Sequence, residues 1–466
     1  MAPLAAYLFA AKGDLVGKII VGVAVFVAIT IIGAIIRYWF FRYRIESDSI
    51  LIREGVLKKT QLDIKFNRIQ AINTQQNIVY RQFDLVTVKF DTAGSAKQEG
   101  HLPAIKSVLA DSLKERIRSD RQVSGIEEGT GTIEDGRPLL QLGNMDMVRI
   151  GLSSNRALIF LVLLGPLFDN IGDRLEESIG EVIFLESIDE AGISIASSVG
   201  LVAAISIAIL LLLAAASIIG AFLRYHGFVL RADSDVIRST GGLLTRHEHS
   251  VNLEKIQSLR AMQNPILRIF GRFRLRAKQA SSGKPGRGKQ FIIPICEPVQ
   301  LPELANEVFG DEFAGSDLLP QSASFQPIAK NYVRSRFLLF GLAPVLLLTA
   351  LIYFLSSELS LVLLWWIPIS AFAAWTYYRK YGFAISENGM VLRKGFVGYQ
   401  TTAFLYRKVQ RISVTQTIFQ ERKGLATVRF FLASGSLRLP YIDFQLAKDI
   451  RDYILYKVES SQRAWH

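Results

Sequence analysis

One pattern of residues occurs three times in this chain of 466 residues, in one register and without gaps. In each copy a glycine precedes a first glutamine by fifteen residues, a basic residue stands two positions before that glutamine, and a second glutamine follows six residues after it. The copies are marked by Gly55, Arg68, Gln70 and Gln76; by Gly242, Lys255, Gln257 and Gln263; and by Gly395, Lys408, Gln410 and Gln416. Repetition in register predicts three copies of one structural unit.

Each copy has the pattern of a small antiparallel β-unit. Apolar and polar residues alternate in short runs such as 43–57 and 383–397, which predicts strands separated by turns. More strands follow the glutamines, and the copies close on segments of helical period such as 104–119 and 443–458. The sum is a barrel or sandwich of antiparallel strands capped by a C-terminal helix.

The signature residues allow two interpretations. A glutamine amide can donate to and accept from backbone groups that a tight bend leaves unpaired, which favours a structural role over ligand contact. The basic residue before each first glutamine is more open, because structure alone does not require a charge there. A role facing the membrane or a partner remains an alternative for it.

Long apolar runs separate the copies. Hydrophobic residues make up 50% of the chain and charged residues 20%, and four runs are long enough to cross a bilayer: 19–36, 195–223, 337–355 and 359–378. A shorter run, 157–168, is expected to span as well, because the alternation of the others requires it. The sequence therefore predicts a membrane protein of the α+β class with about five transmembrane helices, and disfavours a large soluble protein.

Basic residues near the ends of these runs predict the orientation. Arg37, Arg224, Arg336 and Arg379 all lie on one side if the five spans alternate, whereas the other side receives the acidic segment 169–190. Lysine and arginine near span ends mark the cytoplasmic side. We therefore expect a multi-pass plasma membrane protein whose three repeat domains are cytoplasmic.

The organisation that follows has alternating membrane and polar parts. The predicted segments are an N-terminal segment 1–40 with a span at 19–36; a first domain, 41–121; a linker, 122–147; a hairpin of spans, 148–224, formed by 157–168 and 195–223 with the acidic loop 169–190; a second domain, 225–309; a linker, 310–334; a second hairpin, 335–380, formed by 337–355 and 359–378; and a third domain, 381–460. The two linkers are polar and rich in Gly, Ser and acidic residues, so we expect flexible tethers.

This arrangement resembles the bacterial pleckstrin-homology-like (PH-like) membrane proteins of the YdbS/YdbT-like family. The resemblance rests on the three copies of a basic residue, Ile or Val, and Gln, and it covers almost the whole chain apart from a first span that is missing at the N-terminus. It implies PH-like barrels capped by helices and no known enzyme chemistry. It also implies a smaller single-domain relative as a partner, and a context of envelope maintenance or resistance to membrane-active agents.

The second copy carries the clearest charge signal. Arg272, Arg274, Arg276 and Lys278 alternate with apolar residues, so a strand would place all four charges on one face. The loop that follows adds Lys284, Arg287 and Lys289. We expect either a solvated outer face or a surface for anionic lipid headgroups or a partner, and the charge makes this domain the most strongly attracted to anionic surfaces.

Motifs for catalysis or cofactor binding are missing from the sequence. The single cysteine, Cys296, and five scattered histidines do not form a metal-ligand pattern, and the glycine-rich loop near Lys284 lacks the spacing of a phosphate loop. The basic stripe lacks interleaved aromatic residues, which disfavours nucleic-acid binding. We expect no enzyme activity and no cofactor.

These observations favour a non-enzymatic, membrane-anchored scaffold. Its cytoplasmic domains would bind each other, a partner protein or the inner leaflet. A transporter or channel subunit is the alternative, weakened because the spans carry no Asp, Glu, Lys or His that would mark an ion path.

Overall fold

The computed structural model of the chain describes residues 15–56, 58–92, 100–123, 136–154, 188–233, 235–280, 290–313, 318–321, 325–356 and 363–460. These residues fall into two compact units, each treated separately below. The first comprises 1–72, 87–93 and 97–128, and the second comprises 73–86, 94–96 and 129–466.

The first unit starts with a long apolar helix, α2 (Leu15–Phe40), and continues into a small antiparallel sheet. That sheet has β1 (Arg42–Ile45), β2 (Ser49–Glu54) and β3 (Thr60–Lys65) in consecutive order. The short helix η1 (Phe66–Arg68) leads into β4 (Ile69–Asn77), and β5 (Leu85–Thr92), β6 (His101–Lys106) and α4 (Ser107–Val123) follow. Ala110, Leu113 and Ile117 of α4 are buried at helical spacing, so one face of the helix covers the core.

The second unit begins with the end of β4 and α3 (Ile78–Gln82). It then contains β7 (Arg137–Gln141), α5 (Asn144–Leu152), α8 (Ile188–Tyr225), β8 (Val229–Asp233), β9 (Val236–Gly241) and β10 (Thr245–Asn252). These four strands pair in the order β10-β9-β8-β7, and the end of β4 pairs with β10. After η2 (Leu253–Lys255) come β11 (Ile256–Gln263), α9 (Pro265–Ile269), β12 (Phe273–Gln279), β13 (Gln290–Cys296), α10 (Gln300–Phe309) and η3 (Gly310–Glu312).

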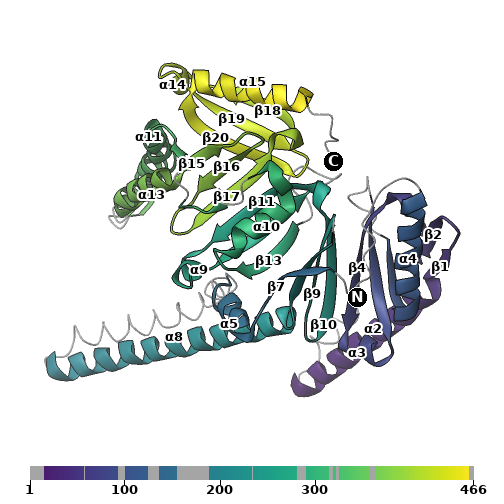
Figure 1. Cartoon of the computed structure of the whole chain (residues 1–466). Helices are drawn as coiled ribbons and strands as arrows, with labels where there is room; N and C mark the ends of the chain where they lie inside the picture. The colour runs from purple at the N-terminus through teal and green to yellow at the C-terminus, as the bar shows by residue number, and fades with distance from the viewer. Residues whose placement is uncertain are drawn as a thin grey trace. The chain divides into compact units, whose positions relative to one another are not determined.

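The rest of the second unit repeats this plan. It has β14 (Gln326–Pro327), α11 (Asn331–Phe337), a π-helical turn η5 (Leu338–Leu342), α12 (Ala343–Ser356), α13 (Trp366–Lys380), β15 (Gly382–Ile385), β16 (Gly389–Lys394), β17 (Tyr399–Leu405), η7 (Tyr406–Lys408), β18 (Val409–Thr415), α14 (Ile418–Glu421), β19 (Leu425–Leu432), β20 (Gly435–Asp443) and α15 (Phe444–Ser460). Seven strands form one antiparallel sheet in the order β13-β12-β11-β17-β16-β15-β14. Strands β18-β19-β20 form another, and α15 lies across it (Figure 1).

Equivalent positions of the three copies have equivalent structure. The turns η1, η2 and η7 start 187 and 153 residues apart, as do the signature glutamines, and each copy has two three-stranded antiparallel parts in the same strand order. Ile69, Ile256 and Val409 are all buried, with at most 4% of their surface exposed. The three copies therefore share one strand order and one buried position, as copies of one structural unit should.

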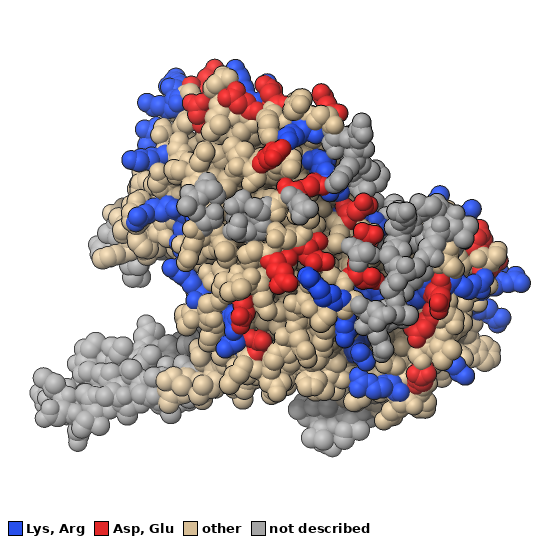
Figure 2. Space-filling model, viewed as in Figure 1, with Lys and Arg blue, Asp and Glu red and all other residues tan. Residues whose placement is uncertain are grey.

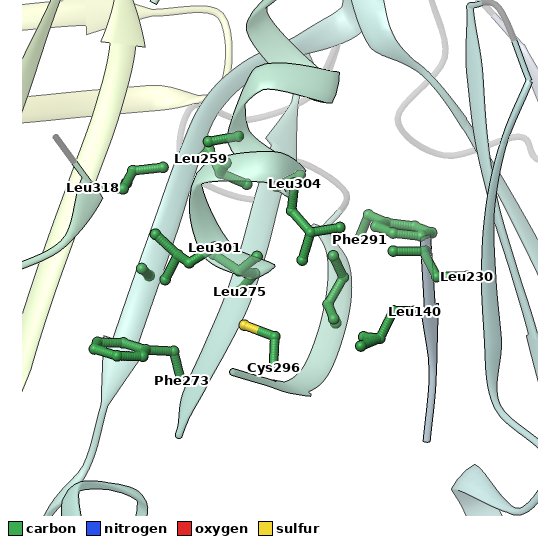
Figure 3. Packing of buried hydrophobic residues seen from close by; sticks show 14 of the residues in the cluster. Leu140, Leu230, Leu259, Phe273, Leu275, Phe291, Cys296, Leu301, Leu304 and Leu318 are labelled. Carbon is green, nitrogen blue, oxygen red and sulfur yellow. The ribbon is translucent and has the colours of Figure 1, made fainter. Parts of the chain in front are cut away.

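The hydrophobic core of the second copy extends into the third. Leu301 and Leu304 of α10 belong to one buried cluster with Leu259 and Leu275 of the sheet (Figure 3). The same cluster includes residues of β15, β16 and β17, namely Ala384, Val391, Ala403 and Leu405. The third copy has a second cluster, closed by Ala447, Ile450 and Ile454 of α15. The two copies are therefore packed together rather than linked only by the chain.

Three helices in the described part of the chain are long and apolar enough to cross a membrane. They are Gly22–Phe40, Ile207–Tyr225 and Asn331–Tyr353. The expected span 157–168 and most of the acidic segment 169–190 lie outside the described residues. Residues 359–362 of the expected span 359–378 also lie outside them, and residues 366–378 belong to α13.

The expectation that 122–147 and 310–334 are flexible tethers is wrong for their described residues. In the first segment β7 pairs with β8. In the second segment β14 pairs with β15. Phe313, Leu318 and Ile328 are buried there, and the Thr401 hydroxyl donates to the Leu318 carbonyl oxygen at 2.7 Å. A few apolar residues are enough to order such a polar segment, because each can be buried separately while the backbone pairs with the edge of a sheet.

Candidate functional site

The second glutamine of each copy makes one recurring hydrogen bond. Its Nε2 donates to the backbone carbonyl oxygen nine residues later: Gln76 to Leu85 at 3.1 Å, Gln263 to Arg272 at 3.3 Å and Gln416 to Leu425 at 2.8 Å. Each bond spans a short helix, α3, α9 or α14, and ties the end of one strand to the start of the next. This geometry accounts for the second glutamine as a structural residue.

The first glutamines differ between the copies. Gln257 is buried and its Nε2 has no hydrogen-bond partner among the described residues, whereas Gln410 is exposed. Gln70 lies in β4, and its side chain is outside what the structure describes. The exposure of the first glutamine therefore differs from copy to copy.

The basic signature residues also differ. Arg68 is exposed, and Lys255 ends the turn η2. Lys408 is 2% exposed, and its Nζ donates to the carbonyl oxygen of Glu254 at 2.5 Å. Glu254 lies in the corresponding turn of the preceding copy, so Lys408 joins two copies.

The basic stripe of β12 is placed on one face, as its alternation predicts, but it is not a fully solvated face. Phe273, Leu275 and Ala277 are buried on the opposite side. Arg272 forms an ion pair with Glu297, and Arg274 Nε donates to the Pro294 carbonyl oxygen at 3.3 Å. Arg276 and Lys278 continue the face, all four being partly buried, and Lys284, Arg287 and Lys289 lie outside the described residues.

The stripe continues across the shared sheet. Arg276 of β12 is directly opposite Arg260 of β11, and Arg260 is opposite Thr402 of β17, so these side chains share a face. Lys394 of β16 extends the group, because it interacts electrostatically with both Arg260 and Lys278. The described residues thus bring four cations together from two copies: Arg260, Arg276, Lys278 and Lys394.

Two of these cations reach a pocket of about 390 Å³ beside the start of the third candidate span. The pocket lies between the sheet, β20 and the helices α11 and α13, and none of its lining residues is acidic. Its basic residues are Arg260, Arg336, Lys394 and Arg438. In the view of Figure 2 the charged side chains near α13 are basic, whereas acidic and basic side chains mix over α15.

Aromatic rings form the wall of this pocket that lies at the start of the third candidate span. The Tyr332 ring lies 5.9 Å from that of Tyr381 and 5.6 Å from that of Tyr441, measured between centroids. Arg336 donates to the Tyr332 hydroxyl at 2.9 Å, and its guanidinium lies 4.7 Å from the ring centroid of Phe340. These contacts hold Arg336 at the polar end of the span by hydrogen bonding and cation–π attraction.

A local irregularity of the helix shapes the same wall. Leu339 and Phe340 line the pocket and belong to the π-helical turn Leu338–Leu342. Pro344 follows it and has no N–H to bond the carbonyl four residues earlier, which favours a widened turn at this point. Leu339 and Phe340 are 65% and 59% exposed, so the pocket has an apolar rim on the side of the span.

The charges of this group are held at a cost. Burial lowers the pKa of the Arg260 guanidinium, and Arg276 lowers it further. Burial also lowers the pKa of Lys394, and Arg260 and Lys278 add to the effect. The buried Nε atoms of Arg260 and Arg276 have no hydrogen-bond partner among the described residues. A bound anion would supply both an opposite charge and the missing acceptors.

Other chemistry has less support in the described residues. Among them no group of three or more His, Cys, Asp or Glu is placed to hold a metal ion. Cys296 is buried, and burial raises the pKa of its thiol to about 12, which suits a packing residue rather than a nucleophile.

Sequence reasoning found the stripe but missed the pocket residues. Arg260 and Lys394 lie in different copies, so no local motif contains both. The available signal was the pair Tyr332 and Arg336 at the start of a span, which is typical of a membrane interface.

Comparison with known proteins identifies the repeated unit. The family model described as "Bacterial PH domain" matches three times, at residues 4–121, 184–308 and 337–458. The chain is 25% identical to the UPF0699 transmembrane protein YdbT of Bacillus subtilis over 420 residues, which cover 86% of this chain and 82% of the relative. It is 28% identical to the UPF0699 transmembrane protein YdbS of the same organism over 82 residues, 18% of this chain and 50% of the relative. No solved structure matches the chain significantly.

Proposed function

Because the chain belongs to the bacterial PH domain family, with three copies of that domain, we propose that it is a non-enzymatic scaffold of the membrane whose pocket binds the phosphate of an anionic phospholipid. The similarity to a transmembrane protein and the three candidate spans are consistent with a membrane protein. The scaffold role and the lipid are the proposal.

The observation that carries this function is a cluster of cations that has no acidic ion-pair partner among the described residues. Like charges at close range in a partly buried site oppose one another, and burial removes the water that would otherwise screen them. Arg260 and Lys394 both have lowered pKa values for these reasons. Without an anion, the repulsion between these partly buried cations destabilises the fold. A bound phosphate would offset this repulsion. Guanidinium groups are well suited to phosphate oxygens.

The apolar rim favours a lipid over a free anion. Leu339 and Phe340 line the pocket and are exposed on a helix long enough to span a membrane. A phosphate held by Arg260 and Lys394 would leave acyl chains beside these residues. The volume of about 390 Å³ fits a headgroup rather than a whole lipid.

The proposal places the three domains in the cytoplasm and five spans in the membrane. Described basic residues at the span ends support this side, because Arg37, Arg224 and Arg336 all lie toward the domains. A transporter or channel has less support, since the three candidate spans within the described residues contain no Asp, Glu, Lys or His.

Lipid counting on the purified full chain tests the proposal. The protein in a neutral detergent is titrated with phosphatidylglycerol, and bound lipid is measured by native mass spectrometry. The double variant Arg260→Gln and Lys394→Gln should bind at least about tenfold more weakly, since each charge-assisted hydrogen bond contributes about 1.5–3 kcal/mol. Lys448→Gln with Arg451→Gln is the matched control, because it removes the same charge from α15, outside the pocket.

Two further ligands separate the possible sources of the phosphate. Phosphatidylcholine should bind more weakly than phosphatidylglycerol, because its choline group is repelled by the cations. Inorganic phosphate should compete only at much higher concentration, because it has no acyl chains for the apolar rim. Equal phosphatidylglycerol binding by the pocket variant and the control would rule out the pocket as the site.

A further inference from the structure

Strand pairing between successive copies follows one rule in the second unit. At the junction of the second and third copies, β11 pairs with β17 so that Met262 is opposite Gln400 and Gln263 is opposite Tyr399. At the end of β4, Gln75 is opposite His247 and Gln76 is opposite Arg246 of β10. Adding 187 to the β4 residues and 153 to the β10 residues gives the paired residues of β11 and β17, because these are the offsets between the copies. The two junctions therefore have the same register.

Two strands of the kind that pair at these junctions lie at sheet edges instead in the described part of the chain. β18 is the third-copy equivalent of β4 and β11, and it is at the edge of the sheet β18-β19-β20. β3 is the first-copy equivalent of β10 and β17, and it is at the edge of the sheet β1-β2-β3. Backbone N–H and C=O groups along such an edge are free to pair with another strand.

Side-chain burial agrees with the free edge of β18. Leu259, a residue of β11 that pairs with β17, is 1% exposed, whereas its third-copy equivalent Ile412 is only partly buried. Ala261, also paired with β17, is 1% exposed, whereas its equivalent Val414 is only partly buried. The same strand position is therefore more deeply buried where a neighbouring copy pairs with it than where none does.

We propose that β18 of one molecule pairs with β3 of a second molecule of this chain, in the register of the two internal junctions. Applying the repeat offsets to both sets of internal pairs gives one answer: Thr415 opposite Thr60, and Gln416 opposite Lys59. A second copy is the occupant because the chain itself carries the complementary edge, with the strand order and length that the internal junctions use. This goes beyond lipid binding and does not depend on it.

The basic signature residue fits this contact. Lys408 donates to the carbonyl oxygen of Glu254 across the internal junction. Applying the repeat offsets to that contact places Arg68 of the second molecule at the backbone of Arg407 in the first. Arg68 is exposed, as a residue without its junction partner would be. The interface would thus reuse the strand pairing of the internal junctions and the lysine contact seen between the second and third copies.

The symmetry of the contact has a consequence for assembly. The two edges are different surfaces, so the contact is head to tail, and each added molecule offers a new free edge. Molecules joined in this way form rows or closed rings along the membrane. Their size would depend on protein concentration.

Cross-linking of two single-cysteine variants tests the interface. One tagged full chain carries Thr415→Cys and a second, with another tag, carries Thr60→Cys, and both are produced in the same cells. Residues opposite one another on antiparallel strands have Cα atoms about 4.5–5.5 Å apart, within the range that a disulfide bridges. Oxidation of the membranes should give a covalent dimer carrying both tags. The native Cys296 is buried and should not contribute.

A shift of one residue provides the matched control. Gln61→Cys in place of Thr60→Cys places the thiol on the other face of β3, so the dimer yield should fall severalfold. Met262→Cys with Gln400→Cys in one chain is the positive control, because these residues are opposite one another inside the molecule.

The outcomes separate the possible occupants. A two-tag dimer that requires position 60 supports the proposal. Equal yields with positions 60 and 61, or no dimer while the positive control forms, would overturn it. A cross-link from Thr415→Cys to a protein of another mass would also overturn it, because a separate partner would then occupy the edge.

Discussion

Among single residues, Lys408 has the most unusual surroundings. Its ammonium group is buried at the junction of two copies and donates to the Glu254 carbonyl oxygen. Burial is the largest effect on it and lowers its pKa to about 8, with Arg407 acting in the same direction. Glu254 and Glu312 oppose the shift but do not cancel it. The surroundings of Lys408 therefore favour its neutral amine over its charged form.

This shift predicts a pH dependence of stability. The ordinary pKa of a lysine is near 10.5, so between about pH 8 and 10.5 the unfolded chain binds more protons at this position than the folded chain. The free energy of unfolding attributable to Lys408 then rises with pH over that window, and below it the cost of the buried charge is fully present. We expect the difference in unfolding free energy between wild type and Lys408→Met to change by at least about 1 kcal/mol across the window.

Chemical unfolding of the full chain at several pH values measures this difference. Titration of the other lysines and tyrosines cancels between wild type and variant. Lys423→Met, at an exposed position, should show no such change. A constant difference between wild type and Lys408→Met would contradict the shift.

The sequence drew attention to this basic residue but not to its contact. The repeat marks Arg68, Lys255 and Lys408 as equivalent, and yet their exposures differ. The acceptor of Lys408 is 154 residues away in the chain, in a turn that has no distinctive composition. The repeat predicts that these residues have the same local backbone structure. Their tertiary contacts depend instead on which copy packs beside them.

Among the elements, α5 and α8 show how a short helix depends on close packing. At Gly151 of α5, a Cβ atom would lie 2.5 Å from the Cα of Ile218 in α8. The Ser217 hydroxyl donates to the Gly151 carbonyl oxygen at 2.8 Å. A small residue lets the two backbones approach, as it does between membrane helices. A helix of nine residues is marginal alone, so this packing stabilises it.

Gly151→Ala should therefore separate the two helices. The obstacle is backbone rather than a flexible side chain, so we expect a loss of about 1–3 kcal/mol from overpacking. Gly220→Ala is the matched control, since it lies in α8 and a Cβ there would have nothing within 4 Å. Thermal unfolding of the purified chain compares them: the first variant should lower the melting temperature and the second should not. Equal melting temperatures would show that α5 and α8 do not need this contact.

The sequence could predict most strands and the closing helices, but not α5. Alternating residues, turns and the threefold register specify the strands in each copy. The segment before α5 reads as a polar linker, and β7 inside it gains its structure only by pairing with β8. Such pairing is set by tertiary context, which local composition does not carry.

At the scale of the whole molecule, the sharing of a sheet between copies is the feature that the sequence did not predict. Three separate domains were expected, but β11 of the second copy pairs with β17 of the third, and residues of β16 and β17 complete the second copy's core. An alternating strand has the same pattern whether its neighbour is in its own copy or the next. The pocket lies where these copies meet, so it could not be predicted either.

Charges at the ends of the apolar helices support the proposed orientation in the membrane. Arg37 closes α2, Arg224 closes α8, Arg334 and Arg336 end α11, and Arg379 and Lys380 close α13. Arg334 and Arg336 lie near the start of the candidate span Asn331–Tyr353, so basic residues mark the domain side of the three candidate spans and of α13. The loop 169–190 is acidic instead. By the positive-inside rule we expect the domains to be cytoplasmic and this loop to be external.

Cysteine labelling of intact cells tests that orientation. Ser187→Cys, at the end of the acidic loop, should react with a membrane-impermeant maleimide added from outside. Ser281→Cys, after the stripe of the second copy, should react only once the cells are opened. The wild-type chain is the background control, because burial raises the pKa of the Cys296 thiol to about 12 and keeps it unreactive. Labelling of Ser281→Cys but not Ser187→Cys in intact cells would reverse the orientation. The pocket would then face the outer leaflet, and the cations at the span ends would contradict the positive-inside rule.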